Sequence, residues 1–279
     1  TICENKPVDT SFTLFGRTVD LPVFAAPVGA MTLHYGDKYN DLAYNDILVA
    51  ACAEAGIAAF TGDGTDPAVM EGAAAAIAKN GGCGVPTVKP WNLETIRQKM
   101  DLVKAADPFA IAMDIDAAGL PFLKNMTPPA GSKTVEELRE IVAMAEKPFI
   151  VKGIMTVAGA KKALEAGAKG IVVSNHGGRV LDQCPSTAEV LPAIVDAVGG
   201  RITILVDGGI RTGMDVFKAL ALGADGVLIG RPFINMIYGA GAEGVKVYVE
   251  KLKAELEDTM AMCGAHSLAD IKRSMIYGY

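Results

Sequence analysis

The segment Ser174-Asn-His-Gly-Gly-Arg179 places a group that can take a proton three residues before a group that can hold a carboxylate. Imidazole changes its charge near neutral pH, so His176 can act as a base. The planar guanidinium of Arg179 can bind a carboxylate through two parallel hydrogen bonds. Because both residues lie among glycines after an apolar run, we expect them to face a ligand; the alternative is a packed turn.

Two later segments combine glycine with arginine in a way that suits a phosphate group. They are Asp207-Gly-Gly-Ile-Arg211 and Gly230-Arg231-Pro232, and each follows an apolar run. Glycine lets backbone N–H groups approach an anion closely, and arginine supplies positive charge. We therefore expect a phosphorylated ligand here; the alternative is two tight turns with solvated arginines. The residues assigned to this site are Gly208, Gly209, Arg211, Gly230 and Arg231.

Three more ionisable residues stand at the ends of apolar runs. An ammonium group in such a place is costly to bury unless it meets an anionic ligand, a cofactor or a neighbouring carboxylate, so we assign Lys152 to the site. Asp114 and Asp116 share one side of a strand, because side chains alternate along it. Either could orient His176 and stabilise its charged form, and we assign that role to Asp116.

Eight short apolar runs must position these residues. They are apolar throughout, which indicates burial on both faces, and helical stretches separate them, which indicates parallel neighbours. Eight such units predict an α/β fold, a single (β/α)8 TIM barrel, whose functional groups collect at the carboxyl ends of the strands. The competing open sheet would want a G-x-G-x-x-G turn after its first strand, and none is present there. The runs are Leu21–Ala26, Ile57–Phe60, Gly82–Pro86, Phe109–Asp116, Pro148–Lys152, Gly170–Ser174, Ile202–Asp207 and Gly226–Gly230.

Helix signals and an internal repeat support this organisation. Capping boxes begin at Thr134 and Ser186, and Thr65 before a proline indicates another helix start. The stretch 151–174 resembles the stretch 206–230, each with a strand, a helix and a second strand. A closing helix is expected from about residue 243 to 262. No Pro/Gly/Ser-rich linker divides the chain, so we expect one domain over residues 1–279.

Composition excludes several classes of partner. The 26 basic and 32 acidic residues give a net charge of −6, without a basic stripe, so we expect no nucleic-acid partner. No apolar run approaches the roughly 18 residues of a membrane helix. Five widely spaced cysteines without a C-x-x-C pair indicate a reduced, cytoplasmic setting and no metal. The fold class favours a homo-oligomer. The chain begins at Thr1 rather than at a methionine, which leaves an N-terminal segment before it open.

Three motifs resemble those of the FMN-dependent 2-hydroxy-acid oxidase and dehydrogenase family, which includes glycolate oxidase and lactate oxidase. The likeness is close from about Pro148 to Ser274 and looser from Asp9 to Asp116. It implies FMN as the cofactor and a small carboxylate-bearing substrate, a 2-hydroxy acid that is oxidised to the 2-oxo acid. The motifs are Ser174-Asn-His-Gly-Gly-Arg-Val-Leu-Asp182, the run from Asp207 to Ala224, and Ile229-Gly-Arg-Pro232.

The resemblance also implies roles for the residues assigned above. His176 would remove the hydroxyl or α proton with Asp116 as its partner, and Arg179 would hold the substrate carboxylate. Lys152 would lie near the flavin N1 edge. The cofactor contacts so implied are Ser174 to the ring or ribityl region, Asp207 to the ribityl chain, the backbone around Ala26, Pro27 and Val28 beside the ring, and Gly208, Gly209, Gly230, Arg211 and Arg231 to the phosphate.

The chain also departs from the family. One active-site tyrosine belongs to an N-terminal segment that this chain lacks, and a second is replaced by Pro86. These hydroxyls help to hold the substrate, so their loss weakens the assignment of a simple 2-hydroxy acid. A flavin-contacting glutamine corresponds to Gly84, and a flavin-contacting threonine corresponds to Asp114.

Two other functions stay open. One is another reaction on an FMN barrel, like that of type 2 isopentenyl diphosphate isomerase, or a reaction like that of inosine monophosphate dehydrogenase. The other is a flavin-binding protein without turnover. Among the weaker signals, we assign His34 to a surface loop, and Asp63 and Asp66 to helix entry rather than to a metal pair.

Overall fold

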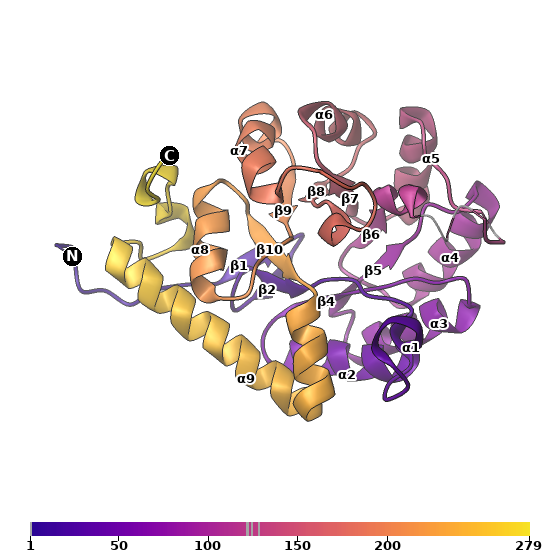
Figure 1. Cartoon of the computed structure of the whole chain (residues 1–279), viewed down its shortest axis with the longest axis horizontal. Helices are drawn as coiled ribbons and strands as arrows, with labels where there is room; N and C mark the ends of the chain where they lie inside the picture. Colours follow the sequence, from indigo (N-terminus) through magenta and orange to yellow (C-terminus); the bar gives the residue numbers. More distant parts are fainter. Residues whose placement is uncertain (1, 121–122, 124, 128) are drawn as a thin grey trace.

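A computed structural model of the chain describes residues 2–120, 123, 125–127 and 129–279. Eight parallel strands form a closed barrel in the order β10-β3-β4-β5-β6-β7-β8-β9, as Figure 1 shows. The barrel closes where Val227 of the last strand pairs with Val23 of the first. All eight predicted runs are confirmed as strands, and with them the predicted fold class. The strands are β3 (Val23–Ala25), β4 (Ala58–Thr61), β5 (Gly84–Val88), β6 (Ile111–Asp114), β7 (Phe149–Ile154), β8 (Gly170–Val173), β9 (Thr203–Val206) and β10 (Gly226–Ile229).

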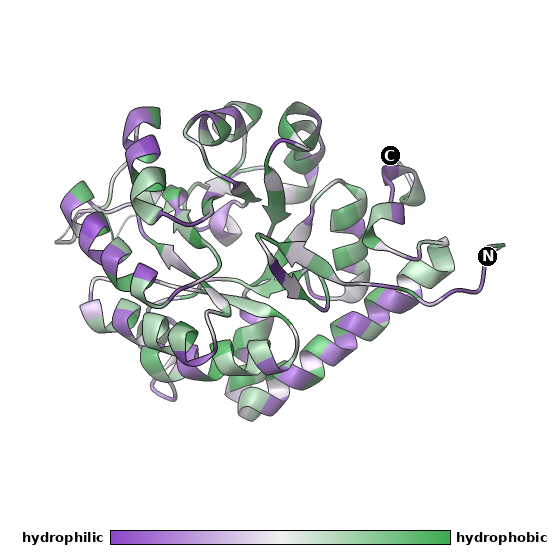
Figure 2. Ribbon diagram, turned by 180° about the vertical axis from the view of Figure 1, so that it is seen from behind, coloured by the Kyte–Doolittle hydropathy of each residue, from purple (hydrophilic) through white to green (hydrophobic). Residues whose placement is uncertain are grey.

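Helices surround the barrel and link one strand to the next (Figure 1). Figure 2 shows that they carry both hydrophilic and hydrophobic residues, whereas the strands are mostly hydrophobic. This is the pattern of helices that cover a core with one face only. The helices are α1 (Met31–Tyr35), α2 (Asp41–Glu54), α3 (Pro67–Lys79), α4 (Leu93–Ala105), α5 (Val135–Ala145), α6 (Val157–Glu165), α7 (Thr187–Val198), α8 (Gly213–Ala221) and α9 (Arg231–Cys263).

The predicted helix starts are mostly confirmed. Thr134 and Ser186 form complete capping boxes at α5 and α7. The start of α3 was misplaced by one residue, because the side chain of Asp66 rather than that of Thr65 caps the helix. The closing helix α9 begins earlier than residue 243, since β10 leads directly into it, and it is kinked at Ala240 and Gly241, where the backbone leaves helical geometry.

Two apolar layers hold the fold together. One lies between the strands and the helices, and the other fills the barrel. The inner layer includes Leu14 and Val19 from the hairpin of β1 (Phe12–Leu14) and β2 (Arg17–Val19). The hairpin lies at the amino ends of the strands, where Arg17 donates to the carbonyl of Gly81. The opposite end, formed by the carboxyl ends of the eight strands, is here called the barrel mouth.

No helix within the described part of the chain is long and apolar enough to cross a membrane. Apart from the hairpin, every strand of the structure belongs to the one barrel. The assignment of residues 1–279 to one domain stays a prediction.

Candidate functional site

Strand alternation carries the polar residues of the site to the barrel mouth. The inward side chains at mid-barrel are apolar, including Ala112 on β6 and Ile150 on β7. Because side chains on one face recur every second residue, the next inward positions fall at the carboxyl ends of the strands. These positions are polar on five neighbouring strands, and they are Thr87, Asp114, Lys152, Ser174 and Asp207.

Lys152, Ser174 and Asp207 form a connected polar chain across β7, β8 and β9. The Lys152 Nζ donates to Ser174 Oγ at 2.9 Å, and Ser174 Oγ donates to Asp207 Oδ2 at 2.9 Å. The Lys152 Nζ is also 3.2 Å from Asp207 Oδ2. Burial lowers the pKa of Lys152, but the charges of three nearby aspartates raise it by more, so it lies above its ordinary value. A buried, fixed ammonium therefore stands in the barrel mouth.

His176 and Asp116 are paired, although 60 residues separate them in the chain. The His176 Nδ1 lies 3.1 Å from both carboxylate oxygens of Asp116. Burial raises the pKa of Asp116, but the hydrogen bond with His176 and nearby positive charges lower it by more, so it lies below its ordinary value. An ionised Asp116 favours the tautomer with a proton on Nδ1, which leaves Nε2 as an acceptor. The pair thus has the geometry of a base and its orienting carboxylate.

Gly153 makes room for Asp116, which sequence reasoning did not anticipate. The pairing register of β7 with β8 shifts between Lys152 and Ile154, so Gly153 is the extra residue of a bulge. Its φ is +102°, and a Cβ there would lie 2.4 Å from Asp116 Cγ. The bulge therefore allows Asp116, rather than Asp114, to reach His176.

Gly153→Ala is expected to destabilise the protein by about 1 to 3 kcal/mol, since alanine disfavours this φ and displaces Asp116. It should also slow the reduction of bound flavin by substrate. Urea unfolding measures the first effect, and anaerobic stopped-flow absorbance measures the second. Gly131→Ala is the matched control, because nothing lies within 4 Å of its Cβ position. Equal stability of the two variants would show that Gly153 has no such role.

The two glycine and arginine segments lie side by side, because β9 and β10 are paired neighbours. Gly208 and Gly209 have φ values of +95° and +80°, which other residues rarely adopt. The space next to Gly209 is open, with nothing within 4 Å of its Cβ position. Gly230 stands at the start of α9, whose first turn lacks a side-chain cap. An uncapped helix amino end beside an open glycine turn suits a phosphate.

The end of β3 adjoins this place. Ala26 donates its backbone N–H to the carbonyl of Ile229 at 2.8 Å, so Ala26 and Pro27 lie next to the end of β10. A Cβ on Gly177 would lie 3.8 Å from Arg231 Nη2, so that guanidinium borders the His176 loop. The segments assigned to FMN and those assigned to substrate therefore share the barrel mouth.

His34 contacts the site, and its assignment to an unrelated surface loop is wrong. It lies on α1, and its Nε2 is 3.3 Å from Arg179 Nη2. Burial and the Arg179 charge lower the pKa of His34, against the opposing charge of Asp41. A neutral imidazole can accept a hydrogen bond from Arg179, so His34 borders the expected carboxylate position. Its place shortly after the first strand was the only sequence signal for this contact.

Asp63 was also misassigned, since it is a buried ion-pair partner rather than a helix-entry residue. Its carboxylate accepts from Lys99 Nζ at 2.6 Å, from Trp91 Nε1 at 2.7 Å and from the backbone N–H of Lys89 at 3.0 Å. These bonds fix the loop after β5, from which the Lys89 side chain reaches the mouth. Asp66 does enter a helix, as predicted. The described residues contain no cluster of three or more His, Cys, Asp or Glu suited to a metal.

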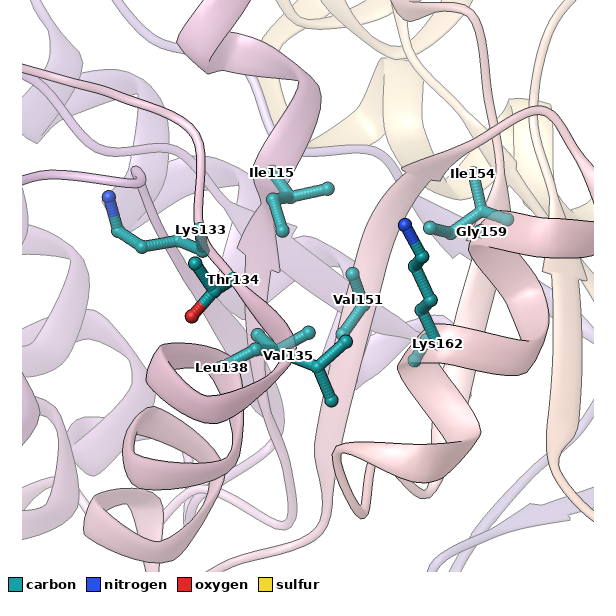
Figure 3. A pocket seen from close by; sticks show the side chains of 10 residues that line it. Ile115, Lys133, Thr134, Val135, Leu138, Val151, Ile154, Gly159 and Lys162 are labelled. Atoms are coloured by element: carbon teal, nitrogen blue, oxygen red, sulfur yellow. The ribbon is translucent and has the colours of Figure 1, made fainter.

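A cavity of about 180 Å³ lies elsewhere, between α5, α6 and β7 (Figure 3). Its lining is mainly apolar and includes the outward side chain of Val151, so the cavity belongs to the layer between strands and helices. Lys133 borders it, but its ammonium donates to the carbonyls of Pro90 and Gly131. The cavity is therefore separate from the site at the barrel mouth.

Three inward polar atoms of the mouth have no hydrogen-bond partner among the described residues. They are Thr87 Oγ1, Asp114 Oδ1 and Asp207 Oδ1, and all three are buried. Unpaired buried polar atoms are rare, and several in one place indicate a ligand that satisfies them. With the open glycine turn and the Lys152 ammonium, they fit a flat, phosphorylated and hydrogen-bonding cofactor.

Comparison with known proteins identifies the family. The FMN-dependent dehydrogenase family matches residues 1–122 and 121–278. The chain belongs to this family. FMN is its cofactor, and the mouth offers a phosphate cradle, a fixed ammonium and unpaired acceptors for it.

Individual relatives agree with this assignment. The chain is 53% identical over 144 residues to peroxisomal (S)-2-hydroxyacid oxidase GLO3 of Arabidopsis thaliana, which covers 52% of this chain and 39% of the relative. It is 47% identical over 146 residues to L-lactate oxidase of Roseobacter sp. strain GAI101, with 52% and 40% covered. The matches thus span about two fifths of the length of these relatives.

Solved structures match over almost the whole chain. Mandelate oxidase with (S)-2-phenylpropionate superimposes with a TM-score of 0.80 at 32% identity, covering 98% of this chain and 83% of that one. A mandelate oxidase variant with (S)-mandelic acid gives a TM-score of 0.82 at 32% identity, with the same coverage. The barrel of this family therefore extends through the described residues.

Proposed function

We propose that the protein is an FMN-dependent enzyme that oxidises a small 2-hydroxy acid to the 2-oxo acid. The observation that carries this proposal is the His176–Asp116 pair at the barrel mouth, on the same loop as Arg179. A base and a carboxylate-binding group are what such a substrate requires. The family and the 2-hydroxy-acid oxidases among the relatives support the same activity.

In this proposal the substrate lies between His176 and Arg179. The guanidinium holds the carboxylate, and His176 Nε2 takes the hydroxyl or α proton. The charged imidazolium that results is stabilised by the ionised Asp116 at 3.1 Å. Bound FMN supplies the two-electron acceptor. His34, which contacts Arg179, would hold the guanidinium in place where the family uses tyrosine hydroxyls.

The remaining assigned residues would hold the cofactor. Lys152 would stand at the flavin N1 edge, where its charge offsets negative charge on the reduced ring. Ser174 and Asp207 would contact the ring and ribityl region, with Asp207 Oδ1 available to a hydroxyl. The phosphate would lie against the glycine turns, and the ring beside the backbone of Ala26 and Pro27. The phosphate-binding residues are Gly208, Gly209, Gly230, Arg211 and Arg231.

The test is the visible spectrum of the FMN-loaded protein, recorded anaerobically before and after addition of a panel of 2-hydroxy acids. We expect at least one acid to bleach the flavin bands. Recovery in air would identify an oxidase, and lack of recovery would identify a dehydrogenase. The control is Arg179→Lys, which keeps the charge but loses the two-point grip and should raise the acid concentration needed. If no acid bleaches the wild-type protein, the isomerase-like or non-catalytic alternative takes its place.

The setting of the protein is also proposed rather than shown. All five cysteines are unpaired in the structure, which agrees with a reduced, cytoplasmic location. The named relatives are peroxisomal or bacterial. We also propose a homo-oligomer, from the fold class alone. Size-exclusion chromatography with light scattering measures that state.

A further inference from the structure

Asp114 is a buried carboxylate with one oxygen paired and one oxygen unpaired. It ends β6, and only 6% of its side chain is exposed. Its Oδ2 accepts from Lys89 Nζ at 2.8 Å. Its Oδ1 is buried and has no partner in the part of the chain that the structure describes. The mechanism proposed above uses neither Asp114 nor Lys89.

The neighbouring side chains do not supply the missing donor. The nearest inward residue on β7 is Lys152, the register partner of Asp114, and its ammonium is bonded to Ser174 and Asp207. Lys89 is bonded to the other oxygen of Asp114. A buried carboxylate oxygen without a donor costs about 1 to 3 kcal/mol or more, so a ligand must offer one.

The oxidised ring of FMN carries one N–H donor, at N3. Its other polar ring atoms, N1, N5 and the two carbonyl oxygens, accept hydrogen bonds. An ammonium such as that of Lys152 suits the acceptors at N1 and C2, and N3 is the next position of the same ring. Lys152 and Asp114 are register partners on adjacent strands, which lie about 4.8 Å apart. The order of the two side chains thus matches the order of acceptor and donor on the ring.

We propose that Asp114 Oδ1 accepts the hydrogen bond of the flavin N3–H, and that Lys89 offsets the charge of this carboxylate. This inference rests on the proposed FMN site. The Lys89 side chain is 14% exposed, so its attraction to Asp114 is little screened by water. Together the two residues recognise the pyrimidine edge of the ring as a nearly neutral pair. Without Lys89, a bare carboxylate would oppose the negative charge that the ring gains on reduction.

The test compares FMN with N3-methyl-FMN, which lacks the donor. Dissociation constants are measured with apoprotein, from the quenching of flavin fluorescence. The wild-type protein should bind FMN roughly 10- to 100-fold more tightly, the range for a hydrogen bond to a charged group. Asp114→Ala should reduce this ratio to about 1 to 3. Asp114→Asn keeps an acceptor of the same shape and should give an intermediate ratio.

Thr87→Val is the matched comparison, because Thr87 Oγ1 is the other unpaired inward atom on this side of the mouth. It should keep the wild-type ratio. If Thr87→Val abolishes the ratio and Asp114→Ala does not, the assignment of N3–H to Asp114 is wrong. Equal binding of the two flavins by the wild-type protein would overturn it without any variant.

A spectroscopic readout separates the hydrogen bond from simple steric fit. With FMN labelled at N3 with ¹⁵N, the N3–H proton should resonate further downfield in the wild-type complex than in the Asp114→Ala complex. An unchanged shift would overturn the proposal. If FMN binds but N3-methylation has no effect, only this inference fails. If the wild-type protein binds no FMN, the proposed function fails with it.

Discussion

His176→Asn is expected to lower the rate of flavin reduction by substrate by about 10²- to 10⁴-fold, the usual contribution of a positioned base. Asparagine can still bond to Asp116 through its amide, but it cannot take a proton at neutral pH. FMN should remain bound, because His176 is assigned to the substrate and not to the cofactor. Anaerobic stopped-flow absorbance at saturating 2-hydroxy acid measures the rate.

The control for this variant is Asp116→Asn, which leaves the imidazole in place but removes its orienting charge. We expect a smaller loss of rate than for His176→Asn, since the base itself is retained. Visible spectra of both variants check that the cofactor is bound. A rate for His176→Asn within threefold of the wild-type rate would show that another group takes the proton.

The second large effect is expected for Lys152→Met. Loss of the ammonium leaves the Asp207 carboxylate without its charged partner at 3.2 Å, in a place where both side chains are mostly buried. Breaking a buried ion pair in this way costs about 3 to 5 kcal/mol. Urea unfolding of the apoprotein measures the loss. FMN should also bind more weakly, which fluorescence quenching measures.

The double variant Lys152→Met/Asp207→Asn separates these two effects. It removes the unpaired charge and should recover most of the stability, while the affinity for FMN stays low. The pH dependence gives an independent check. Because the pKa of Lys152 is raised above its ordinary 10.5, its stabilising effect is present below that pH and is lost as the pH rises through the raised value. Lys152→Met should lack this contribution. Full stability of the single variant would contradict the assigned ion pair.

The barrel itself was predictable from the sequence, because its signals are local. Eight apolar runs, separated by helical stretches with their own capping boxes at Thr134 and Ser186, specify strand and helix within a few residues. Parallel strands of this kind collect their carboxyl ends at one mouth, so the residues after the runs could be assigned to one site. The glycine and arginine turns were likewise visible as short motifs.

The contacts within the site depended on the tertiary structure. Asp114 and Asp116 have the same strand face, and only the bulge at Gly153 decides which of them meets His176. A bulge changes the pairing of two strands, and no local pattern in either strand specifies it. The contact of His34 with Arg179 joins residues 145 positions apart.

The same holds for charge. The sequence showed Lys89, Asp114 and Lys152 as ionisable residues near strand ends, but not which of them pair. Pairing depends on strand register and on the loop that Asp63 fixes after β5, and both are set by packing across the barrel. The amino-acid sequence by itself determined the barrel and the kinds of group at its mouth. Only the tertiary structure decided which carboxylate orients the base and which one keeps an unpaired oxygen, because interactions between distant strands fix those distances.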